Sequence, residues 1–357
     1  MVGGTGHFGR IIARRLSQEG NFRVIVTARD AARAEQTAQE IGCDAAGLDI
    51  EAEDLNAVLE RLSPSITIST AGSFESRDYG LPQAAIATSS HYIDLADNRA
   101  YVCGFDALDA AARSRDVLVT SGASSVPALA MAVIDHYAPT FRALEEVNYG
   151  ISSSERMLGL ATVRSVLAYC GKPFTRLEGG GWTTAYGWGN VSTRRLSNLG
   201  TRWFADCDAP DLELLPRRYG SLKTARFQAG TGLRTTHYGL WLIARLVRLG
   251  LISDASRYAR FLRAAAVALE PLGDGQSAMF LQMDGTGHDG TPRRRVWELV
   301  ARRNQGMEIP CIAAVVLARK LAIGTLSRRG ACACVGLLSL EEYLAELRGL
   351  DISVQES

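Results

Sequence analysis

The sequence has very little lysine. Only three of its 357 residues are lysine, against 36 arginines. A catalytic Schiff-base or general-base lysine therefore has only three possible positions, which are Lys172, Lys223 and Lys320. We interpret the arginine excess as genomic background rather than as electrostatic design.

The chain also lacks a surplus of charge of either sign. Its 39 basic and 38 acidic residues give a formal net charge of +1. A protein that binds the phosphate backbone of DNA or RNA usually carries a basic surplus that neutralises it. We therefore expect no nucleic-acid partner.

No two of the seven cysteines have the C-x-x-C spacing of a zinc or redox motif. Cys332 and Cys334 form a C-x-C pair with no histidine nearby, which is a poor zinc ligand set. We expect small buried thiols in a reducing compartment and no bound metal, with metal or redox use as the alternative.

Long hydrophobic runs are absent as well. A membrane-spanning helix needs about 20 apolar residues, and the best candidate, residues 238–252, is interrupted by Arg245 and Arg248. The N-terminus has glycines and an arginine-rich segment where a signal peptide has an apolar stretch. These features predict a cytoplasmic protein without a membrane span.

The composition that remains, 47% hydrophobic and 22% charged residues, is that of a globular protein of about two domains. Short β-branched runs at residues 22–28, 66–71, 91–95 and 117–120 alternate with amphipathic helical segments. One of these helices, residues 31–41, is expected to begin after the N-cap residue Asp30 and to end at Gly42. That alternation predicts an α/β fold, a Rossmann-type doubly wound parallel sheet. We assign it to residues 1–125.

After residue 125 the pattern changes to longer and less regular segments, which predict a second, α+β domain over residues 126–325. Residues 326–357 form a C-terminal segment. The expected strands are 145–152, 224–228, 278–284 and 293–302, the last two as a hairpin. The expected helices are 127–137, 155–170, 240–249, 255–269, 310–322 and 340–347, and we interpret 240–249 and 255–269 as core or dimer surface rather than membrane anchors.

The strongest local motif is Gly3-Gly4-Thr5-Gly6-His7-Phe8-Gly9, followed by a helical segment. Its G-x-G-x-x-G spacing allows a tight turn, close approach of the backbone to a pyrophosphate at a helix N-terminus, and close helix packing. A helix and then a strand follow, which is the context that the motif needs. We predict that Gly4, Thr5, Gly6, His7, Phe8 and Gly9 bind a dinucleotide.

Arg29 indicates which dinucleotide. An NAD site places an acidic residue at the end of the next strand, where it bonds the ribose hydroxyls, but this sequence has Thr27-Ala28-Arg29 there. A guanidinium can bind a 2′-phosphate and stack on adenine, which favours NADP. The adjacent Asp30 leaves NAD as the alternative.

Two further loops follow predicted strands on the cofactor side. Asp49 and Ile50 are candidates for contact with the adenine, with a turn-forming role for Asp49 as the alternative. Ala71, Gly72, Ser73 and Phe74 end another strand and are predicted to pass close to the nicotinamide ribose. Phe74 could instead be a core residue.

A Rossmann domain also needs a central strand before its glycine loop, and only Met1 and Val2 precede Gly3. We expect a truncated first strand. Because that strand is buried on both faces, its loss would be costly, so we expect that the natural protein starts further upstream.

Several segments together resemble the saccharopine dehydrogenase-like oxidoreductases. The similarity covers nearly the whole chain, although Ser73 stands where that family usually has proline. Its segments are residues 2–16, Val26-Thr-Ala-Arg29, Ala71-Gly-Ser-Phe74, Asp78-Tyr79, His91-Tyr-Ile-Asp-Leu-Ala-Asp97, Ser121-Gly-Ala-Ser-Ser-Val-Pro-Ala-Leu129, 297–301, 309–310, 318–321 and 336–340.

The resemblance implies an NADP(H)-dependent oxidoreductase that transfers a hydride to a small carbonyl or imine substrate derived from an amino acid. It also implies that residues 126–325 are the substrate and dimerisation domain, and that the C-terminal segment, residues 326–357, packs back on the NADP-binding domain. Such chemistry needs a proton source, for which Tyr92, Asp94 and Asp97 are the candidates, and structural roles are the alternative for each. Arginines that could hold a substrate carboxylate are Arg99, Arg156 and Arg234. The other function that we consider is a non-catalytic NADP(H)-binding sensor or scaffold.

Overall fold

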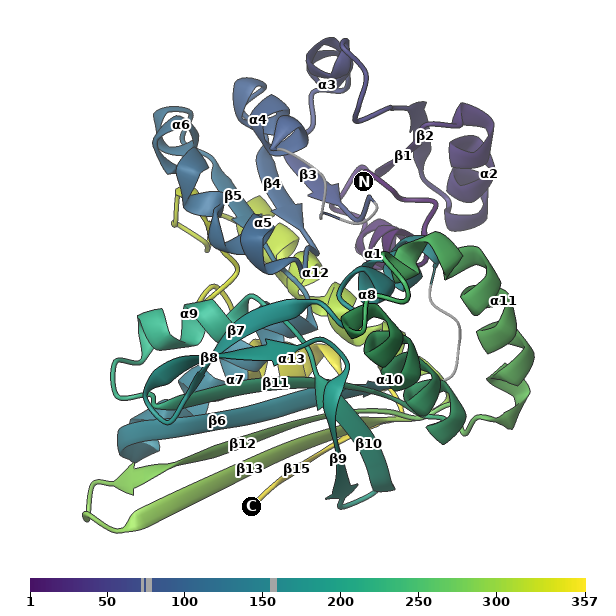
Figure 1. The fold of residues 1–357 in the computed structure, drawn as a ribbon. Helices are drawn as coiled ribbons and strands as arrows, with labels where there is room; N and C mark the ends of the chain where they lie inside the picture. The colour runs from purple at the N-terminus through teal and green to yellow at the C-terminus, as the bar shows by residue number, and fades with distance from the viewer. Residues whose placement is uncertain (72–73, 75–78, 155–158) are drawn as a thin grey trace. The chain divides into compact units, whose positions relative to one another are not determined.

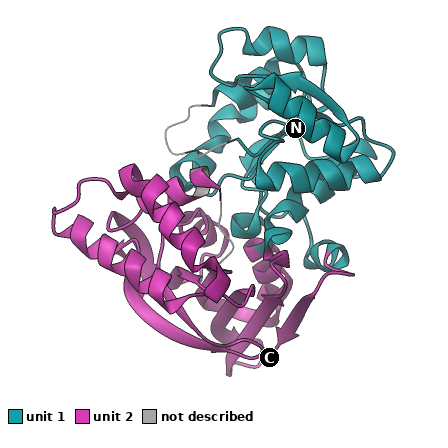
Figure 2. Ribbon diagram, turned by 90° about the vertical axis from the view of Figure 1, so that its right-hand side faces the viewer, with its two compact units in different colours: residues 1–129, 307–346 teal, residues 130–306, 347–357 magenta. Residues whose placement is uncertain are grey.

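The computed structural model describes residues 1–71, 74, 79–154 and 159–357 and divides the chain into two compact units (Figure 2). Unit 1 comprises Met1–Leu129 and Met307–Glu346, and unit 2 comprises Ala130–Gly306 and Leu347–Ser357. Both units are therefore discontinuous in sequence. The reason in unit 1 is that the helix after residue 307 packs against the first helix of the chain.

Unit 1 is built on a parallel sheet. Its strands occur in the order β2, β1, β3, β4, β5 and β14, with the Met1–Val2 segment between β1 and β3. Their bounds are β1 Ile25–Ala28, β2 Asp44–Gly47, β3 Ile66–Ser69, β4 His91–Asp94, β5 Leu118–Ser121 and β14 Gly330–Ala333. This order is that of a Rossmann fold, so the predicted fold class is confirmed.

The central position of the sheet is held by two residues. Val2 bridges Thr27 on one side and Ser69 on the other, both in parallel orientation. The Thr27 N–H donates to the carbonyl of Met1 (2.9 Å), and the Val2 N–H donates to the carbonyl of Ile68 (2.8 Å). These bonds join the two halves of the sheet just before the glycine loop.

Helices connect the strands of unit 1 (Figure 1). Asp30 accepts the Arg33 N–H at the start of α2, and Gly42, with φ of +82°, ends that helix, as its sequence predicts. The helices are α1 His7–Gln18, α2 Ala31–Ile41, α3 Leu55–Leu62, α4 Gly80–Ala87, α5 Arg99–Cys103, α6 Asp109–Ser114, α12 Ile309–Ala322 and α13 Leu340–Glu346.

Helix α12 explains why residues 307–346 belong to unit 1. Nearly all of its first ten residues are buried, and it packs against α1 and α13. At its basic end, Arg319 forms ion pairs with Glu19 of α1 and Glu346 of α13. Lys320 pairs with Glu342 at 2.7 Å. One of the three lysines is thus part of this packing.

Unit 2 contains a seven-stranded mixed sheet in the order β15, β13, β12, β6, β11, β10 and β9, and a separate β7–β8 hairpin. The long β12 and β13 strands form the predicted hairpin. The bounds are β6 Phe141–Ser153, β7 Pro173–Glu178, β8 Gly181–Tyr186, β9 Gly189–Leu196, β10 Gly200–Asp206, β11 Thr224–Thr231, β12 Ser277–Gly287, β13 Pro292–Ala301 and β15 Ile352–Glu356.

The helices of unit 2 differ from the expected ones at their N-termini. The expected 127–137 helix is an α-helix from Ala130, and residues 127–129 belong to a π-helical turn that follows the extended Val126. The 255–269 segment begins with a 3₁₀ turn, Ala255–Tyr258. The helices are α7 Ala130–Tyr137, α8 Leu160–Ala168, α9 Asp211–Arg218, α10 Arg234–Arg248 and α11 Ala259–Leu269.

Five of the seven cysteines are buried, and no disulfide joins cysteines of the described chain. In the same ranges, no three His, Cys, Asp or Glu side chains are grouped as metal ligands. No helix with described residues is long and apolar enough to cross a membrane.

Asp206, at the end of β10, is the charged centre of unit 2. It is fully buried and accepts hydrogen bonds from Arg176 (2.6 Å), Arg226 (2.6 Å) and Asn190 (2.8 Å). Its carboxylate therefore compensates two guanidinium groups that are largely removed from water, one on β7 and one on β11. Removing one partner of a buried ion pair is strongly destabilising, because the other charge stays buried without a counterion.

We predict that Asp206→Asn lowers the free energy of unfolding by about 3 kcal/mol, because both arginines keep their charge and lose the buried carboxylate, and Arg176 retains only the more exposed Glu178. The control is Asp284→Asn, whose partner Arg294 is 66% exposed in its side chain, and it should cost less than about 1 kcal/mol. Urea unfolding measures both. Equal losses for the two variants would contradict a structural role of the buried network.

Candidate functional site

The glycine loop links the two-residue central strand to helix α1. Gly3 has a φ of +71°, and its carbonyl accepts the Gly6 N–H at 2.9 Å, which closes a tight turn. Gly6 then occupies the N-cap of α1, where no side chain caps the helix within the described residues. The first turn of α1 thus has no side-chain cap. Its backbone N–H groups and the positive end of the helix dipole are suited to an anion.

The three glycines of the motif differ in the space around them. A Cβ on Gly4 would lie 2.8 Å from Cγ1 of Val26, and one on Gly9 would lie 2.4 Å from the carbonyl oxygen of Gly3. A Cβ on Gly6 would meet only the Gly3 oxygen, at 3.2 Å. Gly4 and Gly9 are therefore needed for packing within the protein, whereas Gly6 leaves the outer side of the loop open.

The end of β3 lies directly against this loop. Thr70 Oγ1 donates to the Gly3 carbonyl at 3.1 Å, and a Cβ on Gly3 would lie 3.0 Å from the Cα of Ala71. The structure thus brings the predicted Ala71 together with the glycine loop. The predicted Gly72 and Ser73 lie outside the described residues.

Phe74 is a core residue, which is the alternative role considered for it in the sequence analysis. It is buried, and its ring centroid is 5.0 Å from that of Tyr101. Tyr79 and Phe105 extend this aromatic cluster, and Tyr92 stacks on Phe105 at 6.2 Å.

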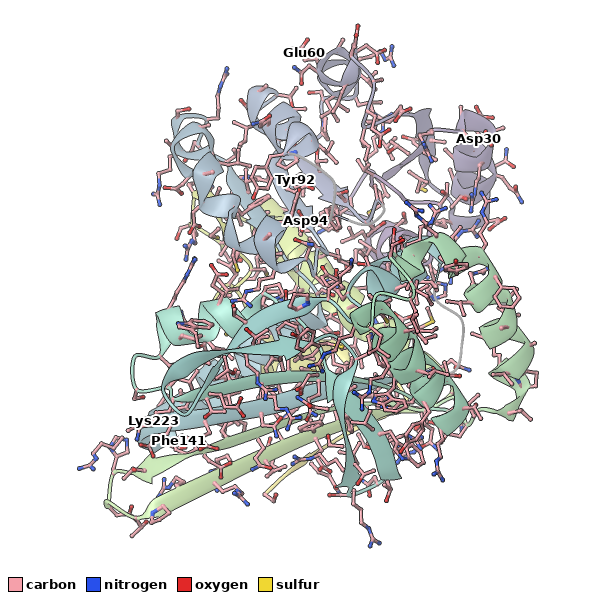
Figure 3. The ribbon with its side chains drawn as sticks, viewed as in Figure 1. Asp30, Glu60, Tyr92, Asp94, Phe141 and Lys223 are labelled. Carbon is pink, nitrogen blue, oxygen red and sulfur yellow. The ribbon has the colours of Figure 1, made fainter. Side chains whose placement is uncertain are left out.

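Arg29 and Asp30 follow β1, as the sequence predicts. The Asp30 carboxylate accepts the Arg33 N–H at 3.3 Å, at the exposed start of α2 (Figure 3). Arg29 is exposed. After β2, Asp49 accepts the Glu51 N–H at 3.1 Å, which is the turn-forming role, and the side chain of Ile50 is half-buried.

Asp94 connects the ends of β4 and β5. It is fully buried, and its Oδ1 accepts hydrogen bonds from the Ser121 hydroxyl (2.7 Å) and from the N–H groups of Ala96 and Gly122 (both 3.0 Å). Its Oδ2 is also buried and accepts no hydrogen bond from the described residues. Burial raises the pKa of Asp94 from 3.8 to about 6, although the bonds to Oδ1 act in the opposite direction.

The other two candidates for proton transfer lie on either side of Asp94 in the sequence. Tyr92 is buried on the same strand (Figure 3), and burial raises the pKa of its phenol, as does the Asp94 carboxylate. Asp97, beyond the strand, is exposed to solvent. β4 thus positions one buried phenol, one buried carboxyl and one exposed carboxylate within six residues.

The three arginines considered for a substrate carboxylate have different surroundings. Arg99 is half-buried at the first position of α5. Arg234, in unit 2, is exposed at the first position of α10, and its guanidinium lies 5.8 Å from the ring of Trp203 and 5.5 Å from that of Tyr238. Arg156 lies outside the described residues.

Sequence reasoning missed Arg10, which directly follows the last glycine of the motif. Its guanidinium donates to Thr37 Oγ1 at 2.9 Å and pairs with Glu40 at 2.5 Å, so it fastens α1 to α2. Its Nε lies 3.4 Å from the carbonyl of Thr5 in the loop. The sequence signal for Arg10 is its position one helical turn after Gly6.

The comparisons with known proteins agree with this geometry. Residues 1–138 match the family model described as "Saccharopine dehydrogenase NADP binding domain". No curated protein matches the sequence.

Solved structures extend the likeness from the saccharopine dehydrogenase NADP-binding domain to the fold of the whole chain. Apo saccharopine dehydrogenase (L-Glu forming) from Saccharomyces cerevisiae is similar with a TM-score of 0.67 at 14% identity, covering 98% of each chain. Homospermidine synthase from Legionella pneumophila, in complex with NAD, has a TM-score of 0.60 at 8% identity, covering 98% of this chain and 88% of that one. The chain thus has a saccharopine dehydrogenase-like oxidoreductase fold.

We predict that Gly9→Ala weakens dinucleotide binding at least about tenfold, because the new methyl group would displace the Gly3 carbonyl and with it the turn. Equilibrium titration of the folded variant with NADPH and NADH measures the change. Gly239→Ala is the matched control, since a Cβ at that helical glycine meets nothing within 4 Å. Unchanged affinity in Gly9→Ala would show that the turn does not hold the dinucleotide.

We also predict that Asp94 makes stability depend on pH. Its folded pKa of about 6 exceeds its ordinary 3.8. Between about pH 4 and pH 6 the carboxyl is therefore protonated in the native state and ionised in the unfolded state. The free energy of unfolding therefore falls as pH rises through that window, by about 3 kcal/mol from this group.

The amide of Asp94→Asn does not titrate. The difference in unfolding free energy between wild type and variant should consequently shift by the same amount between pH 4 and pH 7, as measured by urea unfolding at several pH values. A constant difference over the whole range would mean that the buried carboxyl has an ordinary pKa.

Proposed function

We propose that the chain is an NADP(H)-dependent oxidoreductase that transfers a hydride to a small carbonyl or imine substrate derived from an amino acid. The observation that carries this proposal is the uncapped N-terminus of α1 behind a glycine turn, beside the end of β3. In a doubly wound sheet, this edge is where a dinucleotide binds.

The loop fits a pyrophosphate. The backbone of Gly4, Thr5 and Gly6 with the first residues of α1, His7, Phe8 and Gly9, would hold it, because the helix dipole and first-turn N–H groups favour a doubly charged anion. Gly6 provides the outer surface without a Cβ.

The remaining contacts follow the strand ends of the same sheet. Asp49 and Ile50 would contact the adenine, and Ala71, at the end of β3, would lie by the nicotinamide ribose. When bound, the nicotinamide supplies the hydride, and the protein supplies binding, orientation and protons.

The preference for NADP over NAD rests on Arg29. Asp30 is the acidic residue available to bond ribose hydroxyls, and its carboxylate caps α2. The exposed Arg29 is placed one residue after β1 and can form charge-assisted hydrogen bonds to a 2′-phosphate.

The roles of the β4 residues differ in this proposal. Asp94 acts as a positioning residue, because its Oδ1 holds Ser121 and Gly122 at the end of β5. Tyr92 and the exposed Asp97 are the candidates for proton transfer. Arg99 and Arg234 are the described arginines that could hold a substrate carboxylate. A homodimer and a cytoplasmic location stay predictions from the sequence.

The test is a titration of the folded protein with NADPH and NADH, followed by assays of NADPH oxidation with keto acids, aldehydes, and mixtures of aldehydes and amino acids. We expect tighter binding of NADPH and oxidation with at least one substrate pair. Tight NADPH binding without oxidation by any of them would favour the sensor. Equal affinity for both dinucleotides would contradict the NADP assignment.

We predict that Arg29→Ser lowers NADPH affinity about tenfold or more and leaves NADH affinity unchanged, because a hydrogen bond to a charged group contributes about 1.5–3 kcal/mol. Arg61→Ser is the control, since Arg61 is an exposed arginine in the last turn of α3. Parallel loss of both affinities in Arg29→Ser would mean that Arg29 does not read the 2′-phosphate.

A further inference from the structure

Most of the large apolar side chains that unit 2 exposes to water come from one short stretch of sequence. Within the described chain, only Trp182 and Ile323 are comparably exposed outside it. The stretch runs from residue 238 to residue 272, and its exposed large apolar residues are Tyr238, Leu242, Leu249, Leu251, Tyr258, Phe261, Val267 and Leu272. We call these residues the outer face of α10 and α11.

Helical periodicity separates this outer face from the core on α10. Ala244 is buried in a cluster with α8, and Leu240, Ile243 and Val247 pack against that cluster. Tyr238, Leu242 and Leu249 recur at spacings of four and seven residues and lie on the other side of the helix. One side of α10 thus packs in the core, and the other side is exposed in the described chain.

Helix α11 repeats the arrangement with fewer polar residues. Ala259 and Leu262 belong to the same cluster, so both helices cover one core, and Figure 1 shows them grouped with α8 at one end of the seven-stranded sheet. The stretch from 264 to 269 is entirely apolar in sequence, and it includes exposed alanines and Val267. Phe261 is 72% exposed and Leu272 is 71% exposed. A surface helix of a monomeric protein normally carries polar residues on this side.

The charges of the same stretch are almost all positive. Residues 234–272 contain six arginines and two acidic residues, Asp254 and Glu270, in a chain that is otherwise nearly neutral. Arg245, Arg248, Arg257 and Arg260 are exposed. Arg245 lies over the ring of Trp241 at 5.2 Å, next to the apolar residues of α10. Long arginine side chains of this kind cover apolar surface while their charged ends stay in a polar layer.

The exposed apolar residues and the positive charge together indicate what kind of partner this face binds. A second copy of the chain, docked through the same face about a two-fold axis, would bring six arginines against six arginines with few carboxylates to compensate them. An anionic bilayer surface supplies phosphates for the arginines and an acyl boundary for the leucines and aromatic rings. We propose that the outer face of α10 and α11 docks the protein on the surface of an anionic lipid bilayer.

The experiment is flotation of the full-length protein with large unilamellar vesicles. One set contains phosphatidylcholine alone, and the other contains phosphatidylcholine with phosphatidylglycerol. We expect binding to the anionic vesicles only, and weakening of that binding as salt is raised. The triple variant Leu249→Ser/Leu251→Ser/Phe261→Ser should lose it, and its substituted side chains are exposed, so the fold should tolerate them.

Arg257→Gln/Arg260→Gln tests the electrostatic part and should weaken binding to anionic vesicles about fivefold for each arginine removed. The matched controls substitute equally exposed residues elsewhere. Trp182→Ser/Ile323→Ser removes the other exposed large apolar side chains, and Arg142→Gln/Arg195→Gln removes two exposed arginines of unit 2. Both controls should bind as the wild type does.

Three results would overturn the proposal. The first is a wild-type protein that does not float with anionic vesicles at low salt. The second is binding that the triple serine variant retains or that the controls lose equally. The third is a dimer in sedimentation velocity that the triple serine variant dissociates, with no vesicle binding, because the face would then belong to a second copy of the chain.

Discussion

Backbone atoms around the glycine loop lie so close to their neighbours that Gly3, Gly4 and Gly9 have no room for a side chain. This constraint joins three parts of unit 1. The loop follows the Met1–Val2 segment, which bridges β1 and β3, and it continues into α1, while Thr70 bonds its first carbonyl. The sheet, the helix N-terminus and the end of β3 are thus fixed relative to one another by backbone packing. A helix end suited to an anion results from the same contacts that hold the central sheet together.

A second set of contacts shapes the neighbouring strand ends. Asp94 is a carboxyl without access to water that bonds β4 to the start of the loop after β5, and an aromatic cluster that includes Tyr92 and Phe74 packs nearby. Most of the residues that the sequence proposes for catalysis or cofactor binding therefore also have structural partners. Asp94 can have a structural and a chemical role together, because its partners bond Oδ1, whereas Oδ2 accepts no hydrogen bond from the described residues.

The sequence predicted the parts of the fold whose signals are local. Asp30 and Gly42 mark the ends of α2, the Gly-rich turn separates β12 from β13, and the glycine motif marks the start of α1. The strands β7 to β10 were not predicted, because their residues are mixed in polarity and their pairing depends on partners far along the chain. Membership of α12 and β14 in unit 1 was also beyond local patterns, since it depends on packing against α1 and pairing with β5. The same holds for the site. The spacing of glycines located the loop, whereas the bonds that occupy Asp49, Asp30 and Asp94 could be seen only in three dimensions.

The central claim is that a nicotinamide dinucleotide binds with its pyrophosphate on the backbone of the glycine loop. Hydrogen–deuterium exchange with and without saturating NADPH tests it most directly, because the amides that would bind the phosphates are the reporters. The account predicts slower exchange in the peptide that covers residues 3–10, together with the segment after β3. Saturable NADPH binding with unchanged exchange in residues 3–10 would contradict it.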